Sequence, residues 1–339
     1  MKIPYKVGVL SGLIISLISC GGGSSSSDSN TVPNTPSEPQ PASLTLGISD
    51  APVDDAAAVV ITIDSVTFKM EDGDDVTFDT FSNEAEGIED AETVQIDLLQ
   101  YTGASQFNIL EGATIAAGDY NQVFVSVLTD DIDATYLEEK DGDIKPIKLP
   151  SEQLKLGGIT LADGDDNANV TIEFNLRKSM TYNPGPDRYI LKPTGVRVVD
   201  NAESGSISGT IDLDAINQLG VDCVADSNMI YLYQGNELDS SLLADNFNSE
   251  EANNGAPEGA IAPFDSTAPS FDEETQQYNY EFGFVPAGDY TLAYACNLGE
   301  EGDDAEMYDG IAIANPEEQM ATVSVAAEQQ ATQDFPIAQ

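Results

Sequence analysis

The feature that most restricts the fold is a two-residue alternation of apolar and polar side chains, repeated in short segments. It runs through residues 44–48, 59–63 and 94–98. Successive side chains of a β-strand point to opposite faces, so this period is typical of strands with one buried face. No long segment has the 3.6-residue period of a helix. Many short strands at even spacing predict an all-β protein built as a sandwich or barrel.

Turn signals separate these segments. Asp141-Gly142 predicts a hairpin between residues 135–139 and 144–148. The acidic stretch 82–92 interrupts the alternation, and we expect a loop there. Residues 236–275 are polar and rich in Asn, Glu and Ala, which indicates an irregular insertion.

The start of the chain has the organisation of an export signal. Lys2 and Lys6 precede an apolar run that ends in Leu17-Ile18-Ser19-Cys20. The run is shorter than the ~20 residues that a membrane-spanning helix needs. A cysteine at this place resembles bacterial lipoprotein signals, in which it is lipidated and becomes the first residue. An ordinary signal peptide, or a cysteine there by chance, is the alternative.

The resemblance implies a signal peptide over residues 1–19 and a lipid anchor on Cys20. Residues 20–42 contain runs of Gly and Ser and four prolines without apolar periodicity, so we expect a flexible tether. Gly21 follows the cysteine, whereas Asp there is the inner-membrane retention signal of enterobacterial lipoproteins. The expected location is the outer membrane of a Gram-negative bacterium, facing the periplasm or the cell surface.

Acidic residues far outnumber basic ones, 60 to 12, for a formal net charge of −48. Lys2 and Lys6 lie in the expected signal, so the mature body keeps 12 − 2 = 10 basic residues and stands at −50. This charge repels nucleic acid and anionic head groups, and neither is expected as a partner of the body. The chain has no His, which excludes Ser-His-Asp and Cys-His catalysis.

Three cysteines are present, and the expected lipid takes Cys20. An even pair in an exported domain is most simply a disulfide, so we expect Cys223 and Cys296 to be bonded. Two buried thiols are the alternative.

Several motifs of the first half occur together in one family of bacterial lipoproteins. These motifs are Ser49-Asp50-Ala51-Pro52, Ala117-Gly118-Asp119-Tyr120, Phe174-Asn175-Leu176-Arg177-Lys178-Ser179 and Tyr189-Ile190-Leu191-Lys192-Pro193. Residues 42–200 therefore resemble the domain-of-unknown-function family number 4382. The resemblance implies a β-sandwich on an exported lipoprotein, which we place at residues 43–201, and it implies no known reaction.

The second half begins with Gly205-Ser206-Ile207-Ser208-Gly209-Thr210-Ile211, which resembles the opening strand of transthyretin-like or carboxypeptidase-regulatory-like sandwiches. Val285-Pro286-Ala287-Gly288-Asp289-Tyr290 resembles their turn and strand. We therefore expect a second sandwich over residues 204–339, in tandem with the first. The tyrosines of residues 231–233 and 278–280 have the spacing of core side chains, and exposed sugar-stacking rings are the alternative.

One acidic loop offers oxygen ligands at alternate positions: Asp163, Asp165, Asn167 and Asn169. Calcium takes six to eight oxygen ligands. An EF-hand counted from Asp163 would need Gly and Glu where Ala168 and Phe174 stand, so this is not an EF-hand. Calcium is the one candidate cofactor, and loose attraction of counter-ions is the alternative.

The only basic cluster in the sequence of the body is formed by Arg177, Lys178, Arg188, Lys192 and Arg197. A binding site for an anion or an acidic glycan, centred on Arg177, Lys178, Arg188 and Lys192, is one interpretation. Internal pairing with nearby acids is the alternative, and we favour it.

Together these patterns predict a non-enzymatic surface or periplasmic module with a binding or structural role. A carbohydrate-binding accessory lipoprotein is the second interpretation, and a carboxylate-dependent hydrolase is the third, since 60 acids leave a catalytic pair open. The expected partners are the membrane, through the Cys20 lipid, and a glycan or a surface protein.

Overall fold

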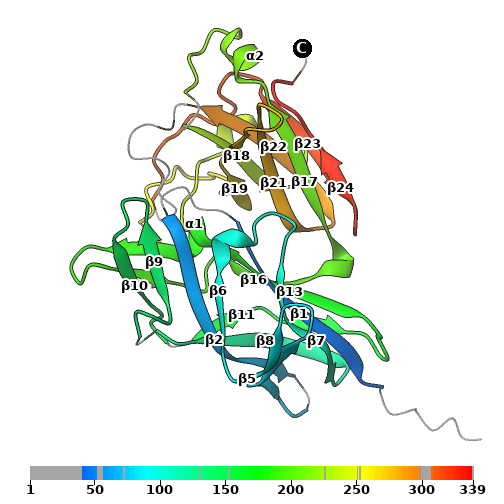
Figure 1. Cartoon of the computed structure of the whole chain (residues 1–339). Coiled ribbons are helices and arrows are strands. Elements are labelled where there is room, and N and C mark those ends of the chain that lie inside the picture. The colour runs from blue at the N-terminus through cyan, green and yellow to red at the C-terminus, as the bar shows by residue number, and fades with distance from the viewer. Residues whose placement is uncertain are drawn as a thin grey trace, which may run out of the picture. The chain divides into compact units, whose positions relative to one another are not determined.

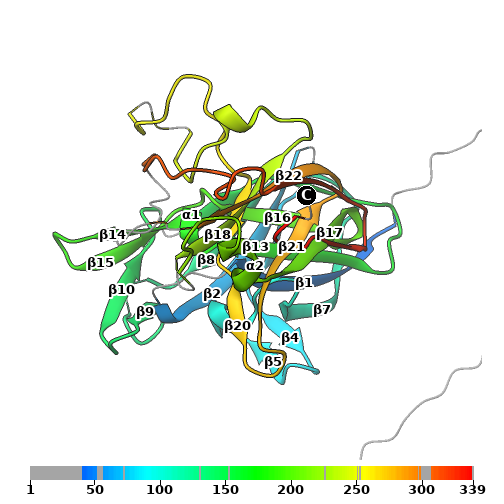
Figure 2. The ribbon, with the colours of Figure 1, turned by 90° about the horizontal axis from the view of Figure 1, so that it is seen from above.

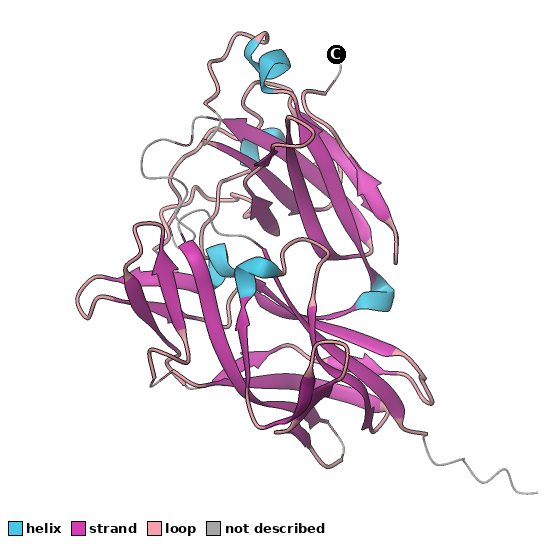
Figure 3. Cartoon of the chain, viewed as in Figure 1, coloured by secondary structure: helices cyan, strands magenta, loops and turns pink. Residues whose placement is uncertain are grey.

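The computed structural model describes residues 40–51, 56–71, 73–129, 131–151, 153–224, 227–249, 251, 253–296, 298 and 307–337. Strands dominate these residues and the helices are short (Figure 3). The all-β prediction is therefore confirmed. None of the helices in the described residues has the length and hydrophobicity that a membrane crossing requires. The expected signal peptide, Cys20 and the tether as far as residue 39 lie outside the described residues.

The first six-stranded sheet has the order β16-β13-β1-β7-β4-β5. Its strands are β1 (Ala42–Ala51), β4 (Phe81–Asn83), β5 (Ile88–Ala91), β7 (Phe107–Ile115), β13 (Ala168–Asn175) and β16 (Val196–Asp200). The central strand β1 pairs parallel with β13 and antiparallel with β7. In Figure 2, β4 and β5 continue this sheet beside β7. The expected loop at residues 82–92 is wrong, because most of it forms the β4–β5 hairpin.

A ten-stranded sheet has β2 and β8 at its centre. Its main path is β11-β8-β2-β9-β10-β15-β14, with β12 on β8 and with β3 and β6 on β2. The strands are β2 (Ala56–Met70), β3 (Val76–Phe78), β6 (Val94–Asp97), β8 (Gly118–Val127), β9 (Tyr136–Glu139), β10 (Ile144–Lys148), β11 (Gln153–Leu156), β12 (Ile159–Leu161), β14 (Met180–Asn183) and β15 (Arg188–Leu191). The predicted hairpin at Asp141-Gly142 is confirmed as β9–β10.

One buried cluster joins these two sheets. It takes Leu44, Leu46 and Ile48 from β1 and Ile61 and Ile63 from β2, all fully buried. These are the apolar positions of the two-residue alternation, so the sequence pattern marks the inner face of the sandwich directly. Short helices connect strands at its rim: η1 (Leu98–Gln100), α1 (Leu176–Ser179) and η2 (Asn201–Glu203).

Two four-stranded sheets follow, with the orders β20-β21-β17-β24 and β19-β18-β22-β23 (Figure 1). Their strands are β17 (Ser204–Ile211), β18 (Asn228–Gln234), β19 (Asp265–Thr267), β20 (Ser270–Asp272), β21 (Gln277–Pro286), β22 (Gly288–Cys296), β23 (Met320–Val325) and β24 (Gln330–Thr332). The helices are α2 (Leu213–Asn217) and η3 (Ser240–Leu242). A second core between the sheets contains Ile207, Phe282, Leu292 and Tyr294.

The sheet that contains β18 and β22 is covered on its other face as well. Met229, Tyr231 and Tyr233 form a third buried cluster there with Leu243 of the insertion. The Tyr233 hydroxyl donates to the carbonyl of Ala244 at 2.6 Å. A sheet buried on both faces explains why β18 is a continuous apolar run rather than an alternating one. The expectation that these tyrosines are core residues is confirmed.

The predicted disulfide joins Cys223 to Cys296, with 5.4 Å between the two Cα atoms. Cys296 ends β22, and Cys223 lies in the connection that leads to β18. The bridge closes a separation of 73 residues and ties that connection to the sheet.

No sheet in the described residues mixes strands β1–β16 with strands β17–β24. This partition supports the predicted boundary between residues 43–201 and 204–339, which stays a prediction. We refer to the two strand sets as the first and the second sandwich. All described residues of both sets belong to one compact unit.

Candidate functional site

Two polar features distinguish this body. The first is a buried charged joint, formed by Glu173, Asn175, Lys178, Arg197 and Asp265. Arg197 Nε lies 2.8 Å from Glu173 Oε2, and its Nη2 lies 3.5 Å from Asp265 Oδ2. Glu173 is 3% exposed and Asp265 is 1% exposed. One guanidinium is therefore shared by two buried carboxylates, one from each sandwich.

Further contacts across the same joint come from the first sandwich. Asn175 Nδ2 donates to Asp265 Oδ1 at 2.5 Å. Lys178 Nζ donates to the carbonyl oxygens of Pro263 and Phe264 at 2.6 and 2.7 Å. The Arg197 guanidinium lies 4.5 Å from the centre of the Phe264 ring, within the range of a cation–π contact. These contacts attach the segment before β19 to the end of β13 and the start of α1.

The environment of Glu173 favours its neutral form. Burial has the largest effect and raises the pKa of the carboxyl, Arg197 and Lys178 lower it, Asp265 raises it, and the net pKa is about 8. The free energy lost when a carboxylate is removed from water exceeds the free energy gained from a guanidinium that it shares with a second carboxylate. The joint is therefore a structural contact that is sensitive to protonation.

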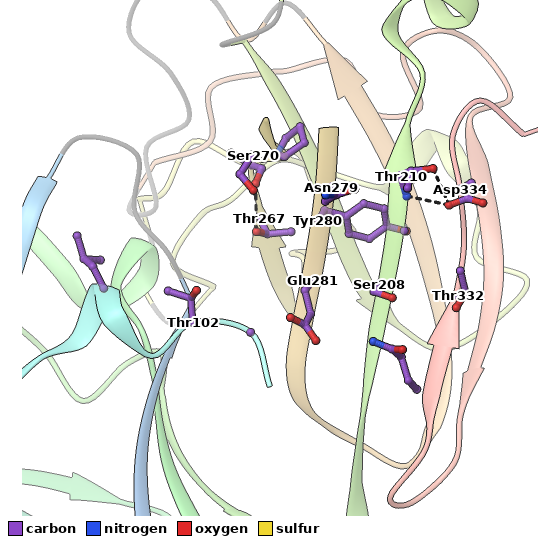
Figure 4. Close-up of a pocket in the computed structure, with 16 residues that line it drawn as sticks. Thr102, Ser208, Thr210, Thr267, Ser270, Asn279, Tyr280, Glu281, Thr332 and Asp334 are labelled. Carbon is purple, nitrogen blue, oxygen red and sulfur yellow. Dashed lines mark hydrogen bonds between the residues drawn. The ribbon is translucent and has the colours of Figure 1, made fainter. Parts of the chain in front are cut away.

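The second feature is a cavity of about 610 Å³, shown in Figure 4. Most of its lining residues carry a hydroxyl, amide or carboxylate group. The residues are Leu99, Thr102, Gly103, Ser208, Gly209, Thr210, Thr267, Ala268, Pro269, Ser270, Asn279, Tyr280, Glu281, Gln330, Thr332 and Asp334. The lining contains neither Lys nor Arg nor Cys.

The floor of the cavity is the outer face of the sheet β20-β21-β17-β24. Alternation puts Ile207 and Phe282 into the core and leaves Ser208 and Glu281 on the opposite face. Strand register then aligns Glu281 with Ser208 and Ser208 with Thr332, in one row across β21, β17 and β24. We call these three residues the polar row.

A second row lies two residues further along the strands. Register aligns Ser270 with Asn279 and Asn279 with Thr210. Asp334 Oδ1 completes the row by accepting from the backbone nitrogen and the hydroxyl of Thr210, at 2.8 and 2.9 Å. The dashed lines between Thr210 and Asp334 in Figure 4 mark these two hydrogen bonds. Asp334 therefore also stabilises the end of β17 by accepting hydrogen bonds from Thr210.

One wall of the cavity comes from the first sandwich, through the connection after η1. A Cβ on Gly283 of β21 would lie 1.9 Å from the carbonyl oxygen of Gly103. A Cβ on Gly103, whose φ is +64°, would lie 2.3 Å from Glu281 Oε2. Because Gly103 and Gly283 have no side chains, the connection after η1 can pack directly against the backbone of β21. This close packing places Thr102, the neighbour of Gly103, at the wall of the cavity (Figure 4).

The predicted calcium loop is placed as a tight turn between β12 and β13. Asp165 Oδ1 accepts from the backbone nitrogen of Asn167 at 2.9 Å, and an oxygen of Asp163 accepts from the backbone nitrogen of Gln40. Asn169 lies within β13, and its side-chain oxygen accepts from Gln106 at 3.3 Å. Three of the four proposed ligands, Asp163, Asp165 and Asn169, therefore also accept hydrogen bonds within the fold, and calcium binding there stays a prediction.

Another acidic group, Glu139, Asp141 and Asp143, has carboxylate oxygens within 4.8 Å of one another at the β9–β10 hairpin. Lys145 Nζ lies 3.9 Å from Glu139 and 3.8 Å from Asp143. It lies 3.1 Å from Asp187. Lys145 thus already offsets part of the negative charge of this cluster.

The predicted anion site is divided between two elements. Arg177 and Lys178 lie on α1, and Arg188 belongs to the β14–β15 hairpin, which Lys192 follows. Lys178 serves the charged joint, and so does Arg197. The favoured interpretation, internal pairing with acids, is confirmed for Arg197. An anion site at the other positions stays a prediction.

The residues of the polar row were not found from the sequence. Ser208, Glu281 and Thr332 look like ordinary outward positions of three separate strands. Only the pairing of β17 with both β21 and β24 brings them into one row.

Comparison with solved structures finds weak likenesses. The Bacillus anthracis TIE protein is 8% identical, with 87% of this chain and 34% of that chain covered and a TM-score of 0.17. BcpA, the major pilin subunit of Bacillus cereus, is 12% identical, with 83% and 60% covered and a TM-score of 0.17. A fimbrial protein from Bacteroides ovatus is 9% identical, with 88% and 49% covered and a TM-score of 0.17.

This chain thus spans from about a third to three fifths of those proteins. At TM-scores this low, the likenesses carry no functional argument. Curated proteins give no significant match.

One family does match, and its profile covers most of the first sandwich. Residues 41–193 match the model of the family described as Domain of unknown function (DUF4382), as the motifs of the sequence indicate.

Proposed function

We propose that this protein is a non-enzymatic surface module, exported and anchored through Cys20, whose two-sandwich body binds a partner. The observation that carries the proposal is the chemistry of the cavity lining. It offers many hydrogen-bonding groups and two carboxylates, Glu281 and Asp334. It includes no His or Lys, the bases that commonly activate a Ser or Thr nucleophile, and no Cys.

The two carboxylates do not stand at neighbouring positions of the sheet. Glu281 lies on β21 and Asp334 follows β24, so they stand on either side of β17 and in successive rows. Asp334 is further engaged by Thr210. This arrangement supports binding rather than turnover.

The charged joint supports the same function. A surface module that holds a partner benefits from a body whose parts keep their relative positions. Arg197 holds a buried carboxyl group of each sandwich, Glu173 and Asp265, and the disulfide secures the second sandwich independently.

The proposal is tested with the full chain carrying Cys20→Ser, which cannot attach to cells through a lipid. We expect it to be retained on whole bacterial or host cells and to leave chromogenic glycoside, ester and peptide substrates unchanged. Substrate turnover that disappears in Glu281→Gln or Asp334→Asn would show that the module is a hydrolase. A chain that is retained on none of the cells would contradict the binding role.

A further inference from the structure

We propose that the cavity over the polar row binds a neutral polyhydroxylated ligand, one or two sugar units of a glycan. This inference rests on the proposed binding function and names its ligand class. The contacts are assigned to Glu281, Ser208 and Thr332, with the Thr102 wall beside them.

The polar row offers unused hydrogen-bonding groups. Among the described residues, the structure gives the side chains of Glu281, Ser208 and Thr332 no hydrogen bond and no ion pair. Glu281 and Ser208 are half-buried and Thr332 is exposed. A half-buried carboxylate and hydroxyl in a recess lose part of their hydration, and they regain hydrogen bonds only from water or from a ligand.

The chemistry of the row matches hydroxyl groups better than other ligands. Each Ser or Thr hydroxyl both donates and accepts, and the Glu281 carboxylate only accepts. A sugar ring presents several adjacent hydroxyls with the same dual capacity. Neighbouring positions of the row are about 4.8 Å apart, so one ring can reach two of them and a disaccharide all three.

The size and the remaining lining agree with this class. A cavity of about 610 Å³ lies within the range of about 300–1,000 Å³ that is typical of small-ligand sites. Leu99, Ala268 and Pro269 add an apolar portion beside the polar groups. Sugar rings have apolar C–H faces as well as hydroxyl edges, and this mixed lining suits both.

Charge excludes one alternative and weakens another. Two carboxylates without a Lys or Arg in the lining repel phosphorylated, sulfated or sialylated ligands. A cationic peptide would need several free carboxylates in one place. Asp334 Oδ1 already accepts two hydrogen bonds from Thr210, which leaves Glu281 as the one carboxylate of the lining without a partner among the described residues.

The test uses the full chain in detergent on immobilised neutral hexose di- and tetrasaccharides, sialylated oligosaccharides and an oligolysine peptide. Ser208→Phe fills the middle of the row, and Glu281→Ala removes its acceptor without adding bulk. Thr322→Phe is the matched control, an exposed threonine on β23 that does not line the cavity. Thermal unfolding of each variant confirms that it is folded.

We expect neutral saccharides to be retained by the parent chain and by Thr322→Phe. Retention of neutral saccharides should fall about tenfold or more in Ser208→Phe and in Glu281→Ala, because each variant loses hydrogen bonds to the ligand in a partly desolvated site. Absence of neutral-saccharide retention, or retention that both cavity variants leave unchanged, would overturn the ligand assignment. Oligolysine retention that Glu281→Ala abolishes would replace it with a cationic partner. In each of these cases, continued retention on whole cells would leave the binding function standing.

Discussion

Replacing Glu173 by Gln tests whether the charged joint is held by an ion pair or by a protonated acid. Glu173 faces Arg197 of β16, Asp265 of β19 and Lys178 of α1. Gln has nearly the same shape as Glu and is neutral at every pH. The variant therefore removes the titration and keeps most of the packing.

The expected size follows from the pKa of Glu173, which burial raises from 4.5 to about 8. A folded-state pKa above the unfolded one means that the folded chain holds the proton more tightly. The stabilisation is fully present below pH 4.5 and is lost as pH rises through 8. At about 1.4 kcal/mol per pH unit, the loss is about 3 kcal/mol at pH 7 and about 5 kcal/mol at pH 9.

Urea unfolding of the parent chain and Glu173→Gln, from pH 5 to pH 9 at constant ionic strength, measures this difference. The two curves should nearly coincide at pH 5, and the variant should be more stable by several kcal/mol at pH 9. Glu111→Gln, an exposed acid on β7, is the control for loss of one negative charge. Its curve should run parallel to that of the parent chain.

One result would refute the reasoning. If Glu173→Gln is less stable than the parent chain by a similar amount at every pH, Glu173 is ionised and its ion pair with Arg197 is a net stabilising contact. Breaking a buried pair of that kind costs about 3–5 kcal/mol.

Three further predictions concern the bridge, the charge and the anchor. Cys223→Ser should lower the free energy of unfolding by about 4 kcal/mol, the value that the chain-entropy model gives for a loop of 73 residues. Titration that finds two free thiols in the denatured, unreduced parent chain would contradict the disulfide. Salt should stabilise the acidic body by screening, since the Debye length is about 10 Å at 0.1 M; a calcium effect no larger than that of sodium at equal ionic strength would end the site at Asp163, Asp165, Asn167 and Asn169. The Cys20→Ser variant should carry no lipid. If this variant is still processed and still partitions with outer-membrane detergent extracts, the lipoprotein interpretation is wrong.

The sequence alone determined the fold class and the inner faces of the strands. Leu44, Leu46 and Ile48 alternate with polar residues, and all three are buried between two sheets. This is readable because the side-chain period of a strand is two, whatever its partners are. The disulfide was predictable from the cysteine count, because the expected lipid takes Cys20 and leaves two cysteines for one bond. The hairpin at residues 81–91 was missed because its acidic residues hide a short two-residue pattern.

Tertiary structure alone decided what the polar residues do. Glu173 and Asp265 are 92 positions apart, and only folding places both beside Arg197 and raises the pKa of one of them. The polar row likewise exists only because β17 pairs with β21 on one side and β24 on the other. Local sequence encodes which way a side chain points along its own strand. It does not encode which distant strand lies beside it, because that register is set by the packing of the whole core.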